Sequence, residues 1–230
     1  MAHMRHVSGA LTALALLAFA VPGSAQVRAE YEVTITNATR GQTFTPLAVL
    51  THAAGIRLFR LGAPALSVLE IVAEEGNVDP LVTLARSVPS VVFDVQTSGA
   101  PPAGFTAPGA SKTVTVVAPV GAQLTLVAML IPTNDAFVAL NGVDLPRDFS
   151  PVTFDAIAYD SGTEINDELC ASIPGPNFAE CNGPGGGGAP TVGAEGYVHV
   201  HAGMHGVGDF NQAQRDWRNP TARVMVRRVR

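Results

Sequence analysis

Hydrophobic and polar residues alternate along much of this chain, in short runs separated by glycine and proline. In the run YEVTITN (31–37), Tyr31, Val33 and Ile35 fall on one face of an extended backbone, and the polar side chains fall on the other. Similar runs follow at 44–52, 56–61, 90–97, 111–118, 122–131, 152–159, 196–201 and 221–229. Many short strands with turn residues between them are typical of an all-β sandwich or barrel.

A helical pattern interrupts the strands at residues 63–86. Leu66, Leu69 and Val72 recur at a spacing of three residues, and Gly76 then provides a stop. The pattern predicts one or two short helices that cover an end of the sheets. We interpret them as an insertion within a single domain.

A carboxylate stands where one apolar run ends, in the segment IPTNDAFVALNGVDLP (131–146). The run breaks at Pro132 and reaches Asp135, and a second acid, Asp144, follows what looks like an Asn-Gly turn. An aspartate in such a place either caps a turn by accepting backbone hydrogen bonds or helps to hold a cation. The local sequence leaves both interpretations open.

The N-terminus has the pattern of an export signal. Basic Arg5 precedes an apolar run at 10–21 and the small-residue segment PGSAQ, so residues 1–25 are predicted to be a signal peptide and residues 26–230 the mature domain. No later stretch approaches the roughly 18 apolar residues of a membrane span. The mature protein is therefore expected to be secreted or periplasmic and not membrane-spanning.

Composition supports one folded domain and excludes one class of partner. With 47% hydrophobic and 14% charged residues, the 230-residue chain has enough apolar material for a core and too few charges for disorder. Its net charge is −5, and its basic cluster is confined to the C-terminal residues 223–230, which argues against nucleic acid. Cys170 and Cys181 are the only cysteines and are predicted to form a disulfide that pins a loop. Phe210 and Trp217 are predicted to be buried beside the last strand.

Several segments, taken in order, resemble one known family. They are YEVTITNATRGQTFTPLAV, LEIVAEEGN, IPTNDAFVALNG, AYDSGTEINDEL and RNPTARVMVRRV. Over residues 31–229 the chain is similar to bacterial secreted members of the spondin N-terminal domain family, whose animal members include F-spondin and mindin. The resemblance implies an antiparallel β-sandwich that acts as a non-enzymatic extracellular adhesion or recognition module. It leaves the partner open between an extracellular protein, a glycan and a cell-envelope ligand.

The resemblance also implies a structural Ca²⁺ site, with Asp135, Asp160 and Glu164 as ligands. Calcium takes six to eight oxygen ligands in flexible geometry, and a tight turn at 161–163 would bring Asp160 and Glu164 together. The alternative is that these acids only cap turns. This chain departs from the animal members in having Ala136 after the first aspartate and glutamate at the third position. Asp144 and Asp167 are spare acids that could substitute.

A second cluster of possible metal ligands lies in the segment EGYVHVHAGMHGVGDF (195–210). His199 and His201 are two residues apart on a predicted strand, hence on one face, and His205 follows a glycine turn. Three imidazoles are a ligand set for zinc or copper, which defines an alternative function: a metalloprotein of unknown activity, enzymatic or not. The chain lacks a G-x-S-x-G motif, a free cysteine once the disulfide forms, and an acid pair spaced for acid–base catalysis, so we do not predict an enzyme.

Overall fold

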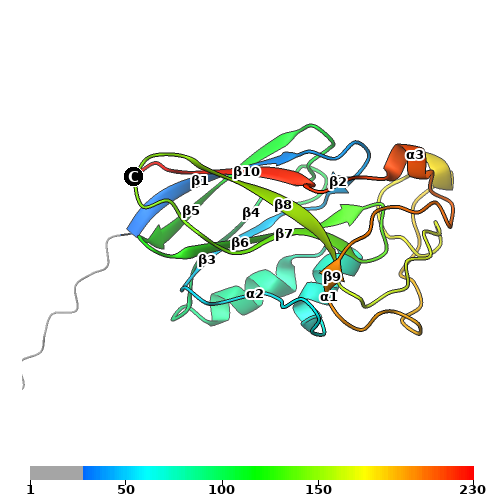
Figure 1. Ribbon diagram of the computed structural model, residues 1–230, viewed down its shortest axis with the longest axis horizontal. Helices are drawn as coiled ribbons and strands as arrows, with labels where there is room; N and C mark the ends of the chain where they lie inside the picture. The colour runs from blue at the N-terminus through cyan, green and yellow to red at the C-terminus, as the bar shows by residue number, and fades with distance from the viewer. Residues whose placement is uncertain (1–27) are drawn as a thin grey trace, which may run out of the picture.

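A computed structural model of the protein describes residues 28–230 (Figure 1). The predicted signal peptide, residues 1–25, lies outside the described part of the chain. The elements are, in order, β1 (Arg28–Asn37), β2 (Thr43–Phe44), β3 (Ala48–His52), α1 (Ser67–Glu75), α2 (Asp79–Ser87), β4 (Val92–Thr97), β5 (Ser111–Pro119), β6 (Gln123–Ile131), β7 (Ala136–Asp144), β8 (Val152–Asp160), the short 3₁₀ helix η1 (Ala179–Cys181), β9 (His199–Val200), α3 (Gln212–Arg215) and β10 (Ala222–Arg228).

The strands form one antiparallel sheet that folds over on itself into two layers. The strand order is β4-β3-β6-β7-β8-β10-β1-β5. Strand β8 makes the corner, because residues 152–156 pair with β10 in one layer and residues 157–160 pair with β7 in the other. The outer strands β4 and β5 are not paired through their backbones. They are linked by a hydrogen bond from the backbone N–H of Val117 to the Asp94 carboxylate at 2.9 Å. The predicted antiparallel β-sandwich is confirmed.

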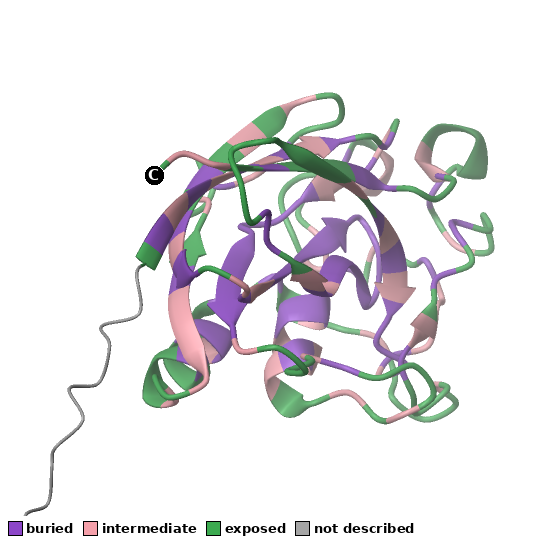
Figure 2. Ribbon diagram, turned by 60° about the vertical axis from the view of Figure 1, so that its left-hand side comes forward, coloured by how far each residue is buried: buried purple, intermediate pink, exposed green. Residues whose placement is uncertain are grey.

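Apolar side chains form two adjoining cores, one on each side of the β3-β6-β7 layer. One core fills the space between the two layers, and the other lies between β3, β6, β7 and the helices α1 and α2. Figure 2 shows the central strands as buried, and strands β8 and β10 include exposed positions. Because β6 and β7 are covered on both faces, their side chains are buried almost without interruption.

Two helices are present where one or two were predicted, but they cover one face of the sheet instead of an end. Helix α1 ends at Gly76, which has a left-handed backbone (φ 65°). A Cβ atom at this position would lie 2.5 Å from the Thr45 side chain, so the chain reverses there at close quarters with the sheet. Helix α2 begins with proline in its first turn, where no backbone hydrogen bond is lost.

Three strand assignments differ from those expected from the sequence. Residues 136–144, where no strand was predicted and Asn141-Gly142 was interpreted as a turn, form the buried central strand β7. Gly142 (φ 78°) is the extra residue of a β-bulge opposite the Leu124–Thr125 step. Residues 56–61, expected to be a strand, are irregular, and the run at 44–52 divides into β2 and β3. A bulge needs a residue with positive φ in the same way as a turn does, which explains the misassignment at Gly142.

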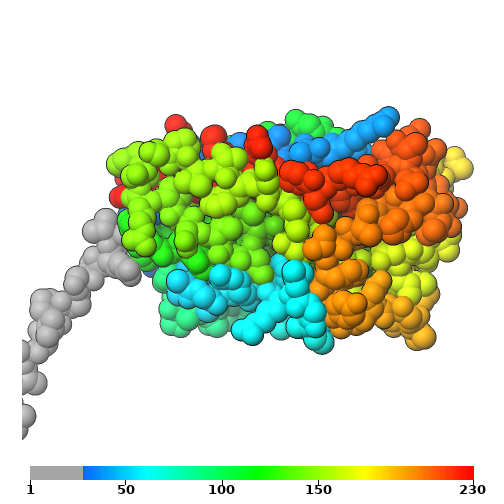
Figure 3. Space-filling view, in the orientation of Figure 1, coloured from blue at the N-terminus to red at the C-terminus, as the bar shows by residue number. Residues whose placement is uncertain are grey.

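A long excursion, residues 161–210, joins β8 to the region before β10 and caps one end of the sandwich. The predicted Cys170–Cys181 disulfide is present within it. The glycine-rich stretch 182–190 is fixed by hydrogen bonds from Gly186 N–H to the Cys170 carbonyl and from Gly188 N–H to the Ser172 carbonyl. Figure 3 shows the excursion packed as one continuous end of the molecule, with residues near 195–200 against the segment near residue 60. Phe210 and Trp217 are buried, as predicted.

Candidate metal centre

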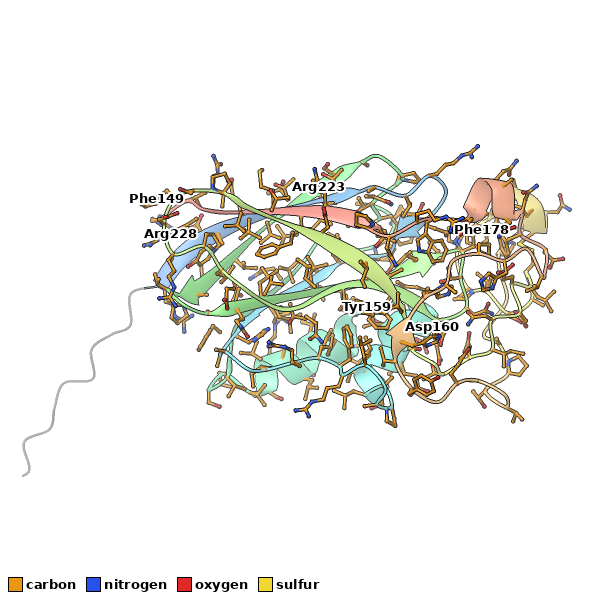
Figure 4. All side chains as sticks on the ribbon, viewed as in Figure 1. Phe149, Tyr159, Asp160, Phe178, Arg223 and Arg228 are labelled. Carbon is orange, nitrogen blue, oxygen red and sulfur yellow. A yellow bond between two sulfur atoms is a disulfide. The ribbon has the colours of Figure 1, made fainter. Side chains whose placement is uncertain are left out.

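Strand pairing brings Asp135 and Asp160 to the same end of the sandwich. Strand β7 begins at Ala136, which lies opposite Asp160, the last residue of β8. The backbone N–H of Ser161 continues this pairing by donating to the Asp135 carbonyl at 3.2 Å. Asp160 lies where β8 meets the excursion (Figure 4), and Asp135 and Asp160 are 0% and 1% exposed. Two aspartates that are 25 residues apart in sequence therefore become neighbours inside the protein.

The turn after β8 holds Asp160 and carries Glu164 to the same place. Asp160 Oδ1 accepts a hydrogen bond from Gly162 N–H at 2.7 Å, and Oδ2 accepts one from the Asn166 amide at 2.8 Å. Gly162 has φ 70°, and a Cβ atom there would lie 2.3 Å from the Tyr197 carbonyl oxygen. Only glycine fits this turn without displacing the segment that leads into β9.

Asp135 caps the turn with only one of its two carboxylate oxygens. Its Oδ2 accepts hydrogen bonds from Ser161 Oγ at 2.8 Å, Thr163 N–H at 2.9 Å and Glu164 N–H at 3.2 Å. Its Oδ1 is buried and has no hydrogen-bond partner in the described structure. The turn-cap interpretation accounts for Oδ2 and leaves a buried, charged oxygen unexplained, which is costly unless a ligand satisfies it.

Glu164 shows the same division between its two oxygens. Its side chain is buried, its Oε1 accepts a hydrogen bond from Ala189 N–H at 2.8 Å, and its Oε2 is buried without a partner in the described structure. The longer glutamate side chain is thus directed into the protein by the loop that contains Ala189. The disulfide and the glycine contacts described above fix the position of that loop.

The carboxyl groups at this site raise one another's pKa values. Burial, followed by the charge of Asp160, raises the pKa of Asp135 to about 6. The hydrogen bonds from the turn lower this pKa, but by less. Burial also raises the pKa of Glu164 to about 8, with further contributions from Glu74, Asp135 and Asp167. The pKa of Asp160 is raised as well, chiefly by burial. Removing such groups from water without a counterion is unfavourable, so the cluster favours a bound cation.

A further acid, Glu74 of α1, lies at the site and was missed by the sequence analysis. Its Oε1 is buried without a partner in the described structure. Burial raises its pKa, and Asp135 adds to the effect by like-charge repulsion. One signal was available in the sequence: Glu74 and Glu75 stand at the end of a predicted helix, where the helix dipole disfavours acids.

The two spare acids do not take part in the same way. Asp144 is at the opposite end of β7 from Ala136, which at about 3.3 Å per residue places it more than 25 Å away. Asp167 is near, but its oxygens already accept hydrogen bonds from Asn134, Leu169 and Ser172.

The histidines lie beside the acids, but in a geometry that differs from a three-imidazole site. His199 Nδ1 and His201 Nε2 lie 3.8 and 3.7 Å from the two Asp160 oxygens. His201 Nδ1 accepts a hydrogen bond from Gly203 N–H, so in the neutral ring Nε2 carries the proton and faces Asp160 as a donor. Burial lowers the pKa of His201 to about 4. His205 is exposed.

The acids fit calcium better than the imidazoles fit a transition metal. Within residues 28–230, no three His, Cys, Asp or Glu side chains are already grouped closely enough to form a ligand set. In the described structure Asp135 Oδ1 and Glu164 Oε2 are nevertheless buried and have no hydrogen-bond partner, so both oxygens are available to a ligand. An all-oxygen donor set of this kind suits Ca²⁺, which tolerates variable geometry.

The fold and the site together define an antiparallel β-sandwich with a buried acidic cluster at one end. The sequence model of the Spondin_N family matches residues 32–170, a span that runs from within β1 to beyond β8 and includes all four acids of the cluster. The chain belongs to the spondin N-terminal domain family. No curated protein matches the sequence. None of the helices described in residues 28–230 has both the length and the apolar character needed to cross a membrane.

Proposed function

We propose that this protein is an exported, non-enzymatic recognition module whose loop-rich end is held together by a structural Ca²⁺ ion. Asp135, Asp160 and Glu164 are the proposed ligands. The observation that carries the proposal is the pair of buried, unpartnered oxygens, Asp135 Oδ1 and Glu164 Oε2. When bound, calcium would neutralise the mutual repulsion of these acids and link the end of β8 to the start of β7.

The recognition role is supported by the surface of the excursion that covers this site. Apolar side chains are exposed on it, among them Val192 at 90% and Val207 at 69%. Single exposed apolar residues are common, but here they occur on a loop pinned by a disulfide and by the acidic turn. Rigid loops on a stable scaffold are the usual carriers of binding sites. The proposed partner is an extracellular protein, a glycan or a component of the cell envelope.

The test combines metal analysis with melting curves in calcium and in chelator. Bound calcium at one ion per chain, with a melting temperature that falls on chelation, supports the proposal. Asp160→Asn should abolish the calcium-dependent shift, because it replaces a charged oxygen at the centre of the site. Asp144→Asn is the matched control, since this exposed aspartate lies at the far end of β7. A melting temperature that is the same in calcium and chelator would falsify the proposal.

The second candidate function is a zinc or copper protein that uses His199, His201 and His205. One observation favours it: His199 Nδ1 and His201 Nε2 are buried without hydrogen-bond partners in the described structure. The hydrogen bond from Gly203 to His201 Nδ1 opposes it, because a metal-bound imidazole normally donates its other N–H to an acceptor. Stoichiometric zinc or copper in the purified protein, with no calcium, would favour this alternative.

A further inference from the structure

Helix α1 ends in a way that is unfavourable for an isolated helix. Its last turn carries Glu74 and Glu75 and no basic residue. The free carbonyl groups at the C-terminal end of a helix bear partial negative charge, so acids there are repelled. Glu75 is exposed to water, which screens its charge, but Glu74 is only partly exposed and its Oε1 is buried without a partner in the described structure.

Glu74 faces the proposed calcium site. Helix α1 packs on β6 and on β7, the strand that begins directly after Asp135. The Thr163 side chain lies within hydrogen-bond reach of the Glu74 carboxyl group, and Thr163 also donates its backbone N–H to Asp135 Oδ2 at 2.9 Å and directly precedes Glu164, so it connects Glu74 to the acidic turn. The buried oxygens without partners at this end of the protein thus come from three elements: α1, the start of β7 and the turn after β8.

We propose that Glu74 is a fourth carboxylate of the cation site and that the bound ion ties helix α1 to the sheet. This inference rests on the proposed function. Two independent observations point to a ligand: Asp135 is 0% exposed and Glu164 is 3% exposed, and each has one oxygen without a hydrogen-bond partner in the described structure. Four carboxylates leave a net charge of about −2 around a dication, so a trivalent ion should bind more tightly than Ca²⁺.

The geometry accounts for the acid at the helix end. A cation beside Glu74 would interact favourably with its carboxylate and with the negative end of the α1 dipole. Without the ion, the same carboxylate adds repulsion to the cluster. The ion would therefore hold together three parts of the chain: the end of α1, the start of β7 and the turn after β8. A site confined to the turn after β8 would not reach α1.

Glu74→Gln and Glu75→Gln form a matched pair of tests, since both remove one charge from the same helix end and keep the side-chain size. In calorimetric titrations of chelator-treated protein with Ca²⁺, Glu74→Gln should weaken binding by about tenfold, which corresponds to ~1.4 kcal/mol. Glu75→Gln should change it by less than about twofold. In chelator, Glu74→Gln should raise the melting temperature, because it removes buried repulsion, while Glu75→Gln should leave it unchanged.

Terbium provides a second measurement, because the only tryptophan, Trp217, packs against His201 with ring centroids 5.0 Å apart, and His201 lies beside Asp160. Tryptophan-sensitised Tb³⁺ luminescence should appear in the wild type, be displaced by excess Ca²⁺, and be weaker in Glu74→Gln than in Glu75→Gln. If the wild type binds Ca²⁺ and Glu74→Gln binds it equally well, the inference about Glu74 is wrong and the calcium function stands. If the wild type binds neither ion, both are wrong.

Discussion

Asp135 combines two roles that a pair of substitutions can separate. One oxygen caps the turn after β8 and the other is free and buried. Asp135→Asn keeps one oxygen for capping and replaces the second by an amide nitrogen, which cannot bind a cation. Asp135→Ala removes both. The difference between the two variants in chelator therefore measures the cap, and their loss of response to calcium measures the metal site.

The size of the capping effect follows from the hydrogen bonds. Asp135→Ala removes the acceptor of four donors: Ser161 Oγ, Thr163 N–H, Thr163 Oγ1 and Glu164 N–H. A buried donor without a partner costs ~1–3 kcal/mol, and the loss of a repelling charge offsets part of the sum, so we expect a net loss of ~3–5 kcal/mol. Asp135→Asn weakens the same bonds but also removes repulsion from Asp160, and it should stay within ~1 kcal/mol of the wild type.

Urea unfolding in chelator and in calcium measures both quantities. At free Ca²⁺ near a hundred times its dissociation constant, the wild type should gain ~2.7 kcal/mol, and both variants should gain almost nothing. Equal stability of the two variants in chelator would show that the Oδ2 hydrogen bonds contribute little. A full calcium gain in Asp135→Asn would show that Oδ1 is not a ligand and that Asp135 is only a turn cap.

Three further predictions concern pH, the core and the disulfide. The pKa of Glu164 is raised from 4.5 to about 8 in the folded state, so the folded protein holds a proton that the unfolded chain loses. The melting temperature of metal-free protein should therefore fall between about pH 4.5 and about pH 8, and a flat profile would contradict this. Trp217→Ala should cost ~3–5 kcal/mol in urea unfolding, whereas Val192→Ala, at an exposed site, should cost under ~0.5 kcal/mol. Replacing both Cys170 and Cys181 by serine should cost ~3 kcal/mol, and an unchanged unfolding midpoint would show that the loop is fixed without the bond.

The sequence predicts best those strands that have one buried and one exposed face. Strand β1 alternates between buried and partly exposed positions along its whole length, so a period of two is visible in its residues. Strand β7 lies between the two cores and is apolar on both faces, which removes the alternation. Its bulge at Gly142 adds a turn-like dipeptide in mid-strand, so local pattern and true structure disagree there.

The acidic site was predictable only where its members are close in sequence. Asp160 and Glu164 are four residues apart around a glycine turn, and their convergence follows from local geometry. Asp135 joins them through the antiparallel pairing of β7 with β8. The family resemblance indicated Asp135, but the sequence pattern did not predict this pairing. Glu74 arrives through the packing of a helix on the sheet, a relation that no spacing along the chain encodes.

Under the proposed function, the arrangement of the acids fits a protein that completes its folding only where calcium is abundant. Buried carboxylate oxygens without partners and acids at a helix C-terminus both oppose folding when no cation is present. Calcium modules outside the cell work with dissociation constants of about 10⁻⁴ to 10⁻³ M, because the ion is abundant there. A weakly binding site is therefore sufficient under the proposed function. Because the acidic cluster is unfavourable without metal, the ordered structure of the excursion would depend on calcium. The exposed apolar residues on the excursion, such as Val192, would then be presented in a fixed arrangement only where the ion is present.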